Sequence, residues 1–184
     1  MNKTLFLYFS LWIAVLSPVF ANAAPESENG LMSNYELGAG DKISISVFRE
    51  PDLALEAKLS DAGTIIFPFL GEMNVKGLTV GKLKDKITQG LSGRYLKDPS
   101  VTVSVLEYRE FFVNGEVNRP GAFPYLPGLT VQKAISIAGG FTERASQSSV
   151  LLEREKDSKH KGAEVEMDAP IAPGDVVIVE ESFF

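Results

Sequence analysis

Two aspartates each stand directly after a glycine where an apolar strand pattern begins, in Gly40-Asp41 and Gly174-Asp175. Two carboxylates that flank a glycosidic bond can act as acid and base in glycan hydrolysis. Turn chemistry explains the same placement, because an aspartate carboxylate accepts hydrogen bonds from nearby backbone N–H groups. We therefore expect Asp41 and Asp175 to shape turns and not to form a catalytic pair.

Residue types for other catalytic or metal chemistry are scarce. The chain has a single histidine, His160, in a lysine-rich stretch, and it has no cysteine. A solvated surface position is the simplest interpretation of His160, and one histidine without thiolates does not fit a transition-metal site. No glycine-rich stretch has the spacing of a phosphate loop. We predict no enzyme activity, no cofactor and no metal.

Four residues are candidates for contacting a ligand. Arg119, Glu143 and Arg144 lie in expected loops, and Tyr125 lies in an expected short strand. Loop charges can contact glycan hydroxyls or a neighbouring subunit, and an exposed aromatic ring can stack on a sugar. Solvated charges and core or edge packing explain the same residues without a ligand, so both interpretations stay open.

Residues 111–141 must position most of these side chains, and their pattern predicts a hairpin that leads into a helix. Gly115 suits a turn that needs positive φ. Pro124 places the returning strand at a sheet edge, because proline cannot donate to a ladder. Thr130 is a plausible helix N-cap, and Gly139-Gly140 ends the helix. A small sheet folded around such a helix is a β-grasp arrangement.

The same unit is echoed upstream. Gly77–Val80 and Gly128–Val131 share the sequence Gly-Leu-Thr-Val, and Phe67-Pro68 repeats as Phe123-Pro124. This internal repeat predicts two hairpin–helix modules. The expected fold class is α+β, with two small sheet-plus-helix modules of which the second is β-grasp.

Alternating apolar residues predict the other elements. Strands are expected at residues 43–47, 53–59, 64–69, 73–75, 101–105, 150–152 and 176–179, with a helix from residue 80. Glu50-Pro51-Asp52 is expected to break the chain between the first two strands. Residues 141–149 are expected to form a polar loop, and residues 156–162 a charged tip.

The first 23 residues resemble a secretory signal. Lys3 precedes an apolar run at residues 5–19, and Ala21-Asn22-Ala23 supplies small residues for cleavage before Ala24. The run is shorter than the ~20 residues of a spanning helix, so we favour cleavage over a membrane anchor. Residues 24–34 read as a flexible leader. A net charge of −6 disfavours binding to nucleic acid.

Several motifs fall in a definite order along the chain. They are Tyr35-Glu36-Leu37-Gly38-Ala39-Gly40-Asp41, Gly77-Leu78-Thr79-Val80, Asp98-Pro99-Ser100-Val101, Val113-Asn114-Gly115-Glu116-Val117, Pro120-Gly121 and Ala138-Gly139-Gly140. In this order they resemble the outer-membrane polysaccharide export family. Residues 35–108 are similar to its polysaccharide export domain, and residues 109–184 to its soluble-ligand-binding β-grasp (SLBB) domain with a terminal strand.

The resemblance implies a periplasmic component of capsular or exopolysaccharide export, acting as a non-catalytic ring or scaffold subunit. It implies polysaccharide, an inner-membrane polysaccharide co-polymerase and further copies of the chain as partners. Pro68 and Pro124 mark edge strands that are candidates for flanking subunit contacts. The alternative is a periplasmic glycan-binding or adaptor module that acts with a separate outer-membrane pore.

Larger members of the family carry a lipidated cysteine, extra β-grasp repeats and a C-terminal pore helix. This chain has no cysteine, and its sequence stops at Phe184. We therefore expect a short, unlipidated member without the pore helix. Such a member would stay in the periplasm, associated with the outer membrane, or dock onto a separate pore protein.

Overall fold

Alternating valine and isoleucine residues run along two of the three strands of the first sheet and bury one face of each. Strands β1 (Lys42–Val47), β2 (Glu50–Lys58) and β5 (Val101–Glu107) pair antiparallel in the order β2-β1-β5. Ile43, Ile45 and Val47 of β1 point into the core. The computed structural model describes residues 34–155 and 162–182.

A hairpin and a helix complete the first lobe. Strands β3 (Thr64–Phe67) and β4 (Gly71–Asn74) form a separate two-stranded sheet, and α2 (Val80–Leu91) follows them. Leu83, Ile87 and Leu91 lie one helical turn apart and are buried in the same core as β1. The periodicity of the helix therefore fixes which face of α2 covers the sheet.

The second lobe is a five-stranded sheet with one short helix against it. Its elements are β6 (Phe111–Gly115), β7 (Gly121–Phe123), α3 (Val131–Ile137), β8 (Ala145–Glu153), β9 (Ala163–Glu164) and β10 (Val176–Glu181). The strand order is β7-β6-β10-β8-β9, with β10 parallel to β6 and the other pairs antiparallel. This arrangement confirms the α+β class and the β-grasp character of the second module.

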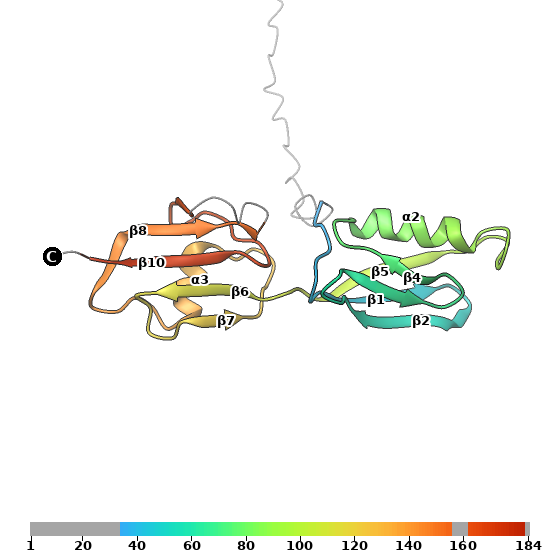
Figure 1. Cartoon of the computed structure of the whole chain (residues 1–184), viewed down its shortest axis with the longest axis horizontal. Coiled ribbons are helices and arrows are strands. Elements are labelled where there is room, and N and C mark those ends of the chain that lie inside the picture. Colours follow the sequence, from blue (N-terminus) through green and yellow to red (C-terminus); the bar gives the residue numbers. More distant parts are fainter. Residues whose placement is uncertain (1–33, 156–161, 183–184) are drawn as a thin grey trace, which may run out of the picture.

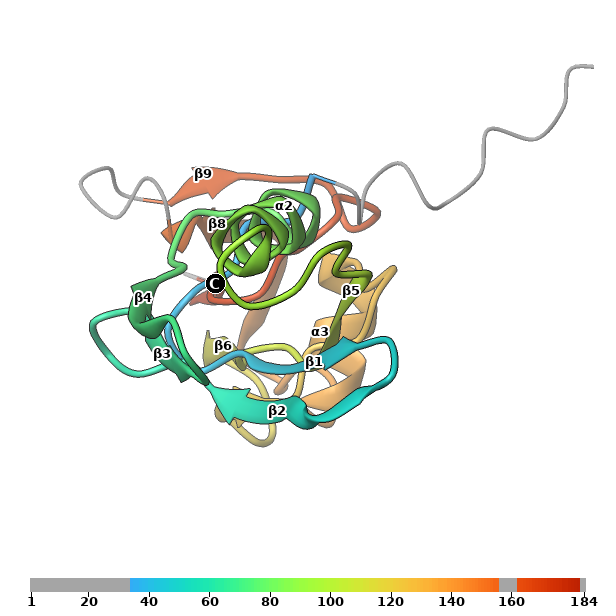
Figure 2. The same ribbon diagram turned by 90° about the vertical axis from the view of Figure 1, so that its right-hand side faces the viewer.

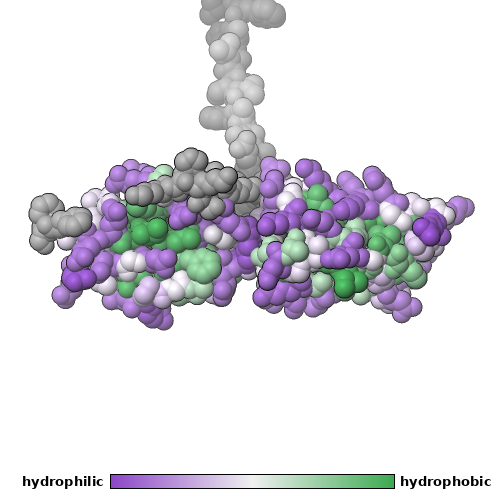
Figure 3. All heavy atoms as spheres, in the orientation of Figure 1, coloured by the Kyte–Doolittle hydropathy of each residue, from purple (hydrophilic) through white to green (hydrophobic). Residues whose placement is uncertain are grey.

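The two lobes have separate hydrophobic cores and lie end to end along the long axis of the molecule (Figure 1). A short extended segment, residues 108–110, joins β5 to β6. Seen along that axis, the sheets and helices of the two lobes overlap in projection (Figure 2). On the face shown in Figure 3, hydrophobic side chains reach the surface in patches among hydrophilic ones.

The predicted helix caps are confirmed. The hydroxyl of Thr79 accepts a hydrogen bond from the Lys82 N–H at the start of α2, and Thr130 does the same for Lys133 in α3. Both helices follow a hairpin, β3–β4 in the first lobe and β6–β7 in the second. The sheets around them differ, because β6 joins a five-stranded sheet whereas β3 pairs only with β4. The repeated sequence therefore gives the same hairpin and helix cap in both lobes, but not the same sheet.

Four strand predictions were wrong at their boundaries. Strand β2 begins at Glu50 and runs through Pro51, because the turn falls earlier, where Arg49 adopts a φ of 64°. Pro68 and Pro124 lie just beyond strands β3 and β7, so neither proline interrupts a ladder. Strand β8 begins at Ala145, inside the expected polar loop, because β10 pairs with it along most of its length.

Some sequence predictions fall outside the described residues. They concern the signal segment and nearly all of the leader, residues 1–33, the tip that contains His160, residues 156–161, and Phe183-Phe184. Within the described ranges, β7 is an edge strand, as its proline neighbour predicted.

Candidate functional site at the junction of the lobes

Asp41 is fully buried at the end of the first lobe that faces the second. Its carboxylate accepts hydrogen bonds from the Gly38 backbone N–H at 2.8 Å and from the Tyr35 hydroxyl at 2.6 Å. The backbone N–H of Arg109 donates to its other oxygen at 2.8 Å, and the Arg109 guanidinium lies 3.2 Å away. The aspartate thus shapes a turn, as expected, and also holds the linker between the lobes.

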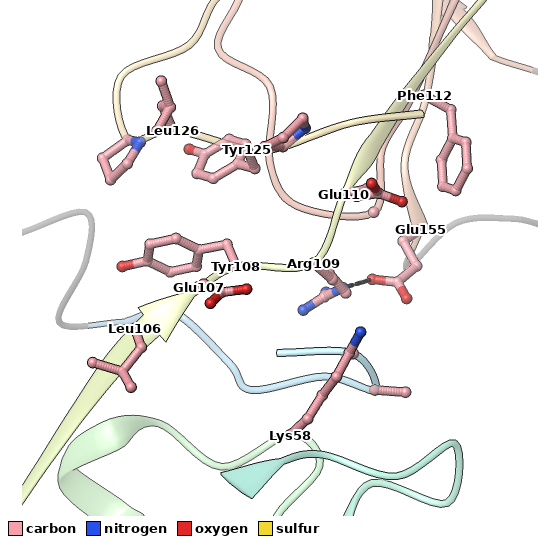
Figure 4. A pocket seen from close by; sticks show the side chains of 15 residues that line it. Lys58, Leu106, Glu107, Tyr108, Arg109, Glu110, Phe112, Tyr125, Leu126 and Glu155 are labelled. Atoms are coloured by element: carbon pink, nitrogen blue, oxygen red, sulfur yellow. Dashed lines mark hydrogen bonds and ion pairs between the residues drawn. The ribbon is translucent and has the colours of Figure 1, made fainter. Parts of the chain in front are cut away.

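Arg109 extends this contact into the second lobe. Its Nε donates to the Glu155 carboxylate at 2.9 Å, and its Nη2 forms an ion pair with the same oxygen (Figure 4). Burial works against the charge of Arg109, but Tyr35, Glu155 and Asp41 outweigh this effect and raise its pKa. We call the chain of contacts Asp41–Arg109–Glu155 the junction latch. It connects side chains of both lobes through one guanidinium.

The second lobe repeats the pairing of a strand-starting aspartate with an arginine. Asp175 is buried, and it accepts hydrogen bonds from the Ala172 backbone N–H at 2.8 Å and from Arg154 Nη1 at 2.7 Å. In each lobe the arginine follows the antiparallel neighbour of the strand that the aspartate begins. Both carboxylates are therefore engaged in structural contacts.

Three tyrosines form a row across the junction. Tyr35 and Tyr108 meet edge to face with ring centroids 5.0 Å apart, and Tyr108 meets Tyr125 in the same way at 5.5 Å. Burial, followed by the hydrogen bond to Asp41, raises the pKa of Tyr35. Burial also raises the pKa values of Tyr108 and Tyr125. The phenols therefore stay neutral at physiological pH.

A groove of about 920 Å³ opens beside this row, between the lobes (Figure 4). Leu106, Phe112 and Leu126 line it and remain exposed, with 62% of Leu126 accessible. Its other lining side chains mix aromatic, proline and charged types, and include Lys58, Glu107, Glu110, Tyr125, Pro124 and Pro127. A groove that combines exposed apolar side chains with charged ones suits binding of another molecule.

The four candidate ligand residues are divided between two places. Tyr125 lines the junction groove and is 8% exposed. Arg119, Glu143 and Arg144 follow elements that end at the opposite end of the second lobe. There Arg119 donates to the Ile137 carbonyl at 2.8 Å, which holds the end of α3.

Arg144 belongs to a surface ion-pair network at that far end. It contacts Glu116 at 3.0 Å and Glu181 at 3.4 Å. Hydrogen bonds from Thr142 and Arg144 lower the pKa of Glu116. Both arginines thus have contacts within the chain, and the structure does not bring them together with Tyr125.

Sequence reasoning missed Arg109 and Glu155. The expected domain boundary lies at residues 107–110, so Arg109 was within it, but a lone charge in a linker has no distinctive pattern. The sequence feature that could have indicated Arg109 is the repeated Gly-Asp pair, because a buried aspartate needs a cationic partner to balance its charge.

No helix in residues 34–155 and 162–182 is long and apolar enough to cross a membrane. Over the same ranges, no group of three or more acidic, histidine or cysteine side chains could hold a metal ion.

Family models match both lobes. The model described as "Polysaccharide biosynthesis/export protein" matches residues 30–106, and the SLBB domain model matches residues 111–166. The chain belongs to the polysaccharide export family. Its latch residue Arg109 lies between the two matched regions, so the latch joins the export domain to the SLBB domain.

Curated relatives agree with this assignment. The chain is 31% identical over 163 residues to the EPS I polysaccharide export outer membrane protein EpsA of Ralstonia nicotianae, covering 74% of this chain and 40% of that protein. It is 32% identical over 139 residues to the exopolysaccharide production protein ExoF of Rhizobium meliloti, covering 68% of this chain and 32% of that protein. The chain thus spans 40% and 32% of the length of these two relatives.

Proposed function

We propose that this chain is a non-catalytic scaffold subunit in the export of exopolysaccharide at the outer membrane. The family of both domains and the names of the relatives EpsA and ExoF support this role. Polysaccharide is then the cargo, and the work of the protein is to position other molecules. The buried carboxylates Asp41 and Asp175 have structural partners, which supports a role without catalysis.

The observation that carries the proposal is the latched junction with its apolar groove. The latch fixes the export domain against the SLBB domain, so the groove is a defined surface of the two-domain body. Edge strand β7 ends beside Pro124, which lines the groove. An edge strand beside exposed apolar side chains is a suitable surface for a neighbouring copy.

The partners and the location follow from the same proposal. Copies of the chain associate through the groove into a ring or scaffold that guides polymer. An inner-membrane polysaccharide co-polymerase delivers the polymer, and a separate outer-membrane pore receives it. The chain reaches the periplasm by a cleaved signal peptide and acts there without a lipid anchor.

Analytical ultracentrifugation over a concentration series tests the groove contact. We expect the wild-type protein to associate and Leu126→Asp to remain monomeric, because a charge in the groove would have to be desolvated. Ile66→Asp is the matched control, since Ile66 is also an exposed apolar residue but lies on β3, away from the groove. A wild-type protein that stays monomeric at high concentration would instead favour the adaptor role.

Gene deletion tests the function itself. Deletion should abolish or strongly reduce secreted polysaccharide, and the wild-type gene should restore it. A gene encoding Leu126→Asp should restore it poorly although the protein accumulates normally. Normal polysaccharide secretion in the deletion strain would refute the export role.

A further inference from the structure

Two residues outside the groove have unusual backbone conformations. Arg49 and Phe69 both have φ of 64°, and they are the non-glycine residues with positive φ within the described ranges. Large side chains rarely adopt this conformation, and it persists mainly where the surrounding structure imposes it. Such outliers often mark functional sites.

Both outliers lie at the end of the first lobe that is remote from the second. Strand β1 starts directly after the junction residue Asp41, so its turn into β2 at Phe48-Arg49 lies at the far end. The turn from β3 to β4 lies against the last turn of α2, because Leu70 packs over Gly90. In Figure 2 this end of the molecule faces the viewer.

At each turn a phenylalanine projects into solvent next to an arginine. Phe69 is 66% exposed and stacks on Tyr95, with ring centroids 5.0 Å apart and an angle of 17° between the rings. The Arg94 guanidinium lies 5.3 Å from the Tyr95 ring. In the other turn Phe48 is 68% exposed, and the Arg49 guanidinium lies 5.0 Å from its ring.

The Phe69 ring is held in place by its neighbours. The Tyr95 hydroxyl donates to the Phe69 carbonyl at 3.3 Å, and Leu70 anchors the turn on α2. A Cβ at position 90 would lie 2.9 Å from a Leu70 methyl, so Gly90 makes room for this anchor. From this turn Leu70 packs against the core, whereas the Phe69 ring contacts Tyr95 and remains largely exposed.

We propose that these two aromatic–arginine clusters, Phe69–Tyr95–Arg94 and Phe48–Arg49, form a glycan-binding surface. It lies at the end of the export domain that is remote from the SLBB domain. The C–H face of a pyranose ring is apolar and stacks on exposed aromatic rings. A guanidinium beside the ring donates hydrogen bonds to sugar hydroxyls or carboxylates. Two separate aromatic–arginine clusters at one end of the lobe suit binding of an extended glycan chain and not of a single sugar. The identity of the ligand as exported polymer rests on the proposed function.

Isothermal titration calorimetry tests this with short oligomers of the exopolysaccharide purified from the source organism. We expect the wild-type protein to bind the oligomers and not their constituent monosaccharides. Phe69→Ala and Phe48→Ala should each weaken binding about tenfold or more, the effect of losing a well-packed aromatic contact.

Arg94→Ala should weaken binding more for carboxylated oligomers than for the same oligomers after carboxyl reduction. Ile66→Ala is the matched control, because Ile66 is an exposed apolar residue on β3 of the same lobe that belongs neither to these aromatic–arginine clusters nor to the groove.

Phe69→Gly separates binding from folding. Glycine adopts positive φ without strain, so this variant should have a thermal midpoint equal to or above that of Phe69→Ala and still bind about tenfold more weakly than wild type. Unchanged binding by both Phe69 variants and Phe48→Ala, or no binding by wild type, would overturn the inference. So would variants of this surface that abolish self-association and leave oligomer binding intact. Export phenotypes of the deletion strain would stand in either case.

Discussion

Asp41 is completely buried, and its charge is balanced by Arg109, whose side chain is 15% exposed. Removing one partner of a buried pair leaves an uncompensated charge in the interior. We therefore expect Arg109→Ala to lower the free energy of unfolding by about 3 kcal/mol, measured by urea denaturation. Arg109→Lys should be intermediate, because a lysine cannot contact Asp41 and Glu155 with a planar fork.

Lys84→Ala is the control for this variant. Lys84 is an exposed cation on α2 in the same lobe, and its loss should change stability by less than about 0.5 kcal/mol. Equal stability of Arg109→Ala and Lys84→Ala would mean that solvent reaches Asp41 and that the latch does not contribute to the free energy of unfolding.

Tyr35 gives the junction a predictable response to alkaline pH. Its pKa is raised above the ordinary value of 10.0, so the folded state retains its proton where the unfolded state loses it. This contribution to stability is complete below pH 10 and declines as pH rises above it. The thermal midpoint of the wild type should therefore fall more steeply above pH 10 than that of Tyr35→Phe, followed by circular dichroism. Parallel curves for the two proteins would contradict this assignment.

Single-residue patterns in the sequence predicted local roles but not long-range partners. The turn role of Asp41 and Asp175 was readable because the carboxylate contacts a backbone N–H only three residues away. Arg109 reaches Asp41 across 68 positions of sequence, which no local pattern encodes. Three of the four candidate ligand residues, Arg119, Glu143 and Arg144, lie in expected loops, and loops at opposite ends of a lobe look alike in sequence.

At the scale of elements, the helix caps make a clear prediction. Thr79 caps α2 by accepting from the Lys82 N–H at 3.3 Å. Thr79→Ala should lower the free energy of unfolding by about 1 kcal/mol, whereas Thr79→Asp should preserve it, because aspartate also caps and favours the helix dipole. Chemical denaturation of both variants measures the difference. A cap without energetic effect would leave both variants equal to wild type.

Periodicity predicted which elements exist better than where they end. The stripe Leu83, Ile87 and Leu91 and the alternation of β1 and β5 were visible in sequence, because each buries one face. Strand β8 starts earlier than expected because its polar first half is held by backbone pairing with β10 near its end. Pairing of this kind depends on a distant partner, so side-chain patterns do not report it.

At the scale of the whole molecule, the latch explains how two separately cored lobes keep one orientation. Within the described residues the two hydrophobic clusters are distinct, so the polar contacts at the linker and the tyrosine row across the junction carry the connection. The lobes share a local sequence echo and a repeated Asp–Arg pair, but their sheets are built differently. The fold class was therefore predictable from sequence, and the relative position of the lobes was not.

Glu155 tests this connection without removing a partner of Asp41, because its side chain contacts Nε and Nη2 of Arg109, whereas Asp41 contacts Nη1. We expect Glu155→Ala to widen the range of orientations between the lobes while both remain folded. The chain has no native cysteine, so spin labels can be placed at Lys84→Cys and Gln147→Cys, one exposed site on each lobe. Pulsed electron paramagnetic resonance should give a narrow distance distribution for the labelled parent and for the surface control Glu166→Ala, and a broader one for Glu155→Ala. Equally narrow distributions in all three would show that the linker and the tyrosine row orient the lobes without Glu155, and the groove would then keep its shape without the complete latch.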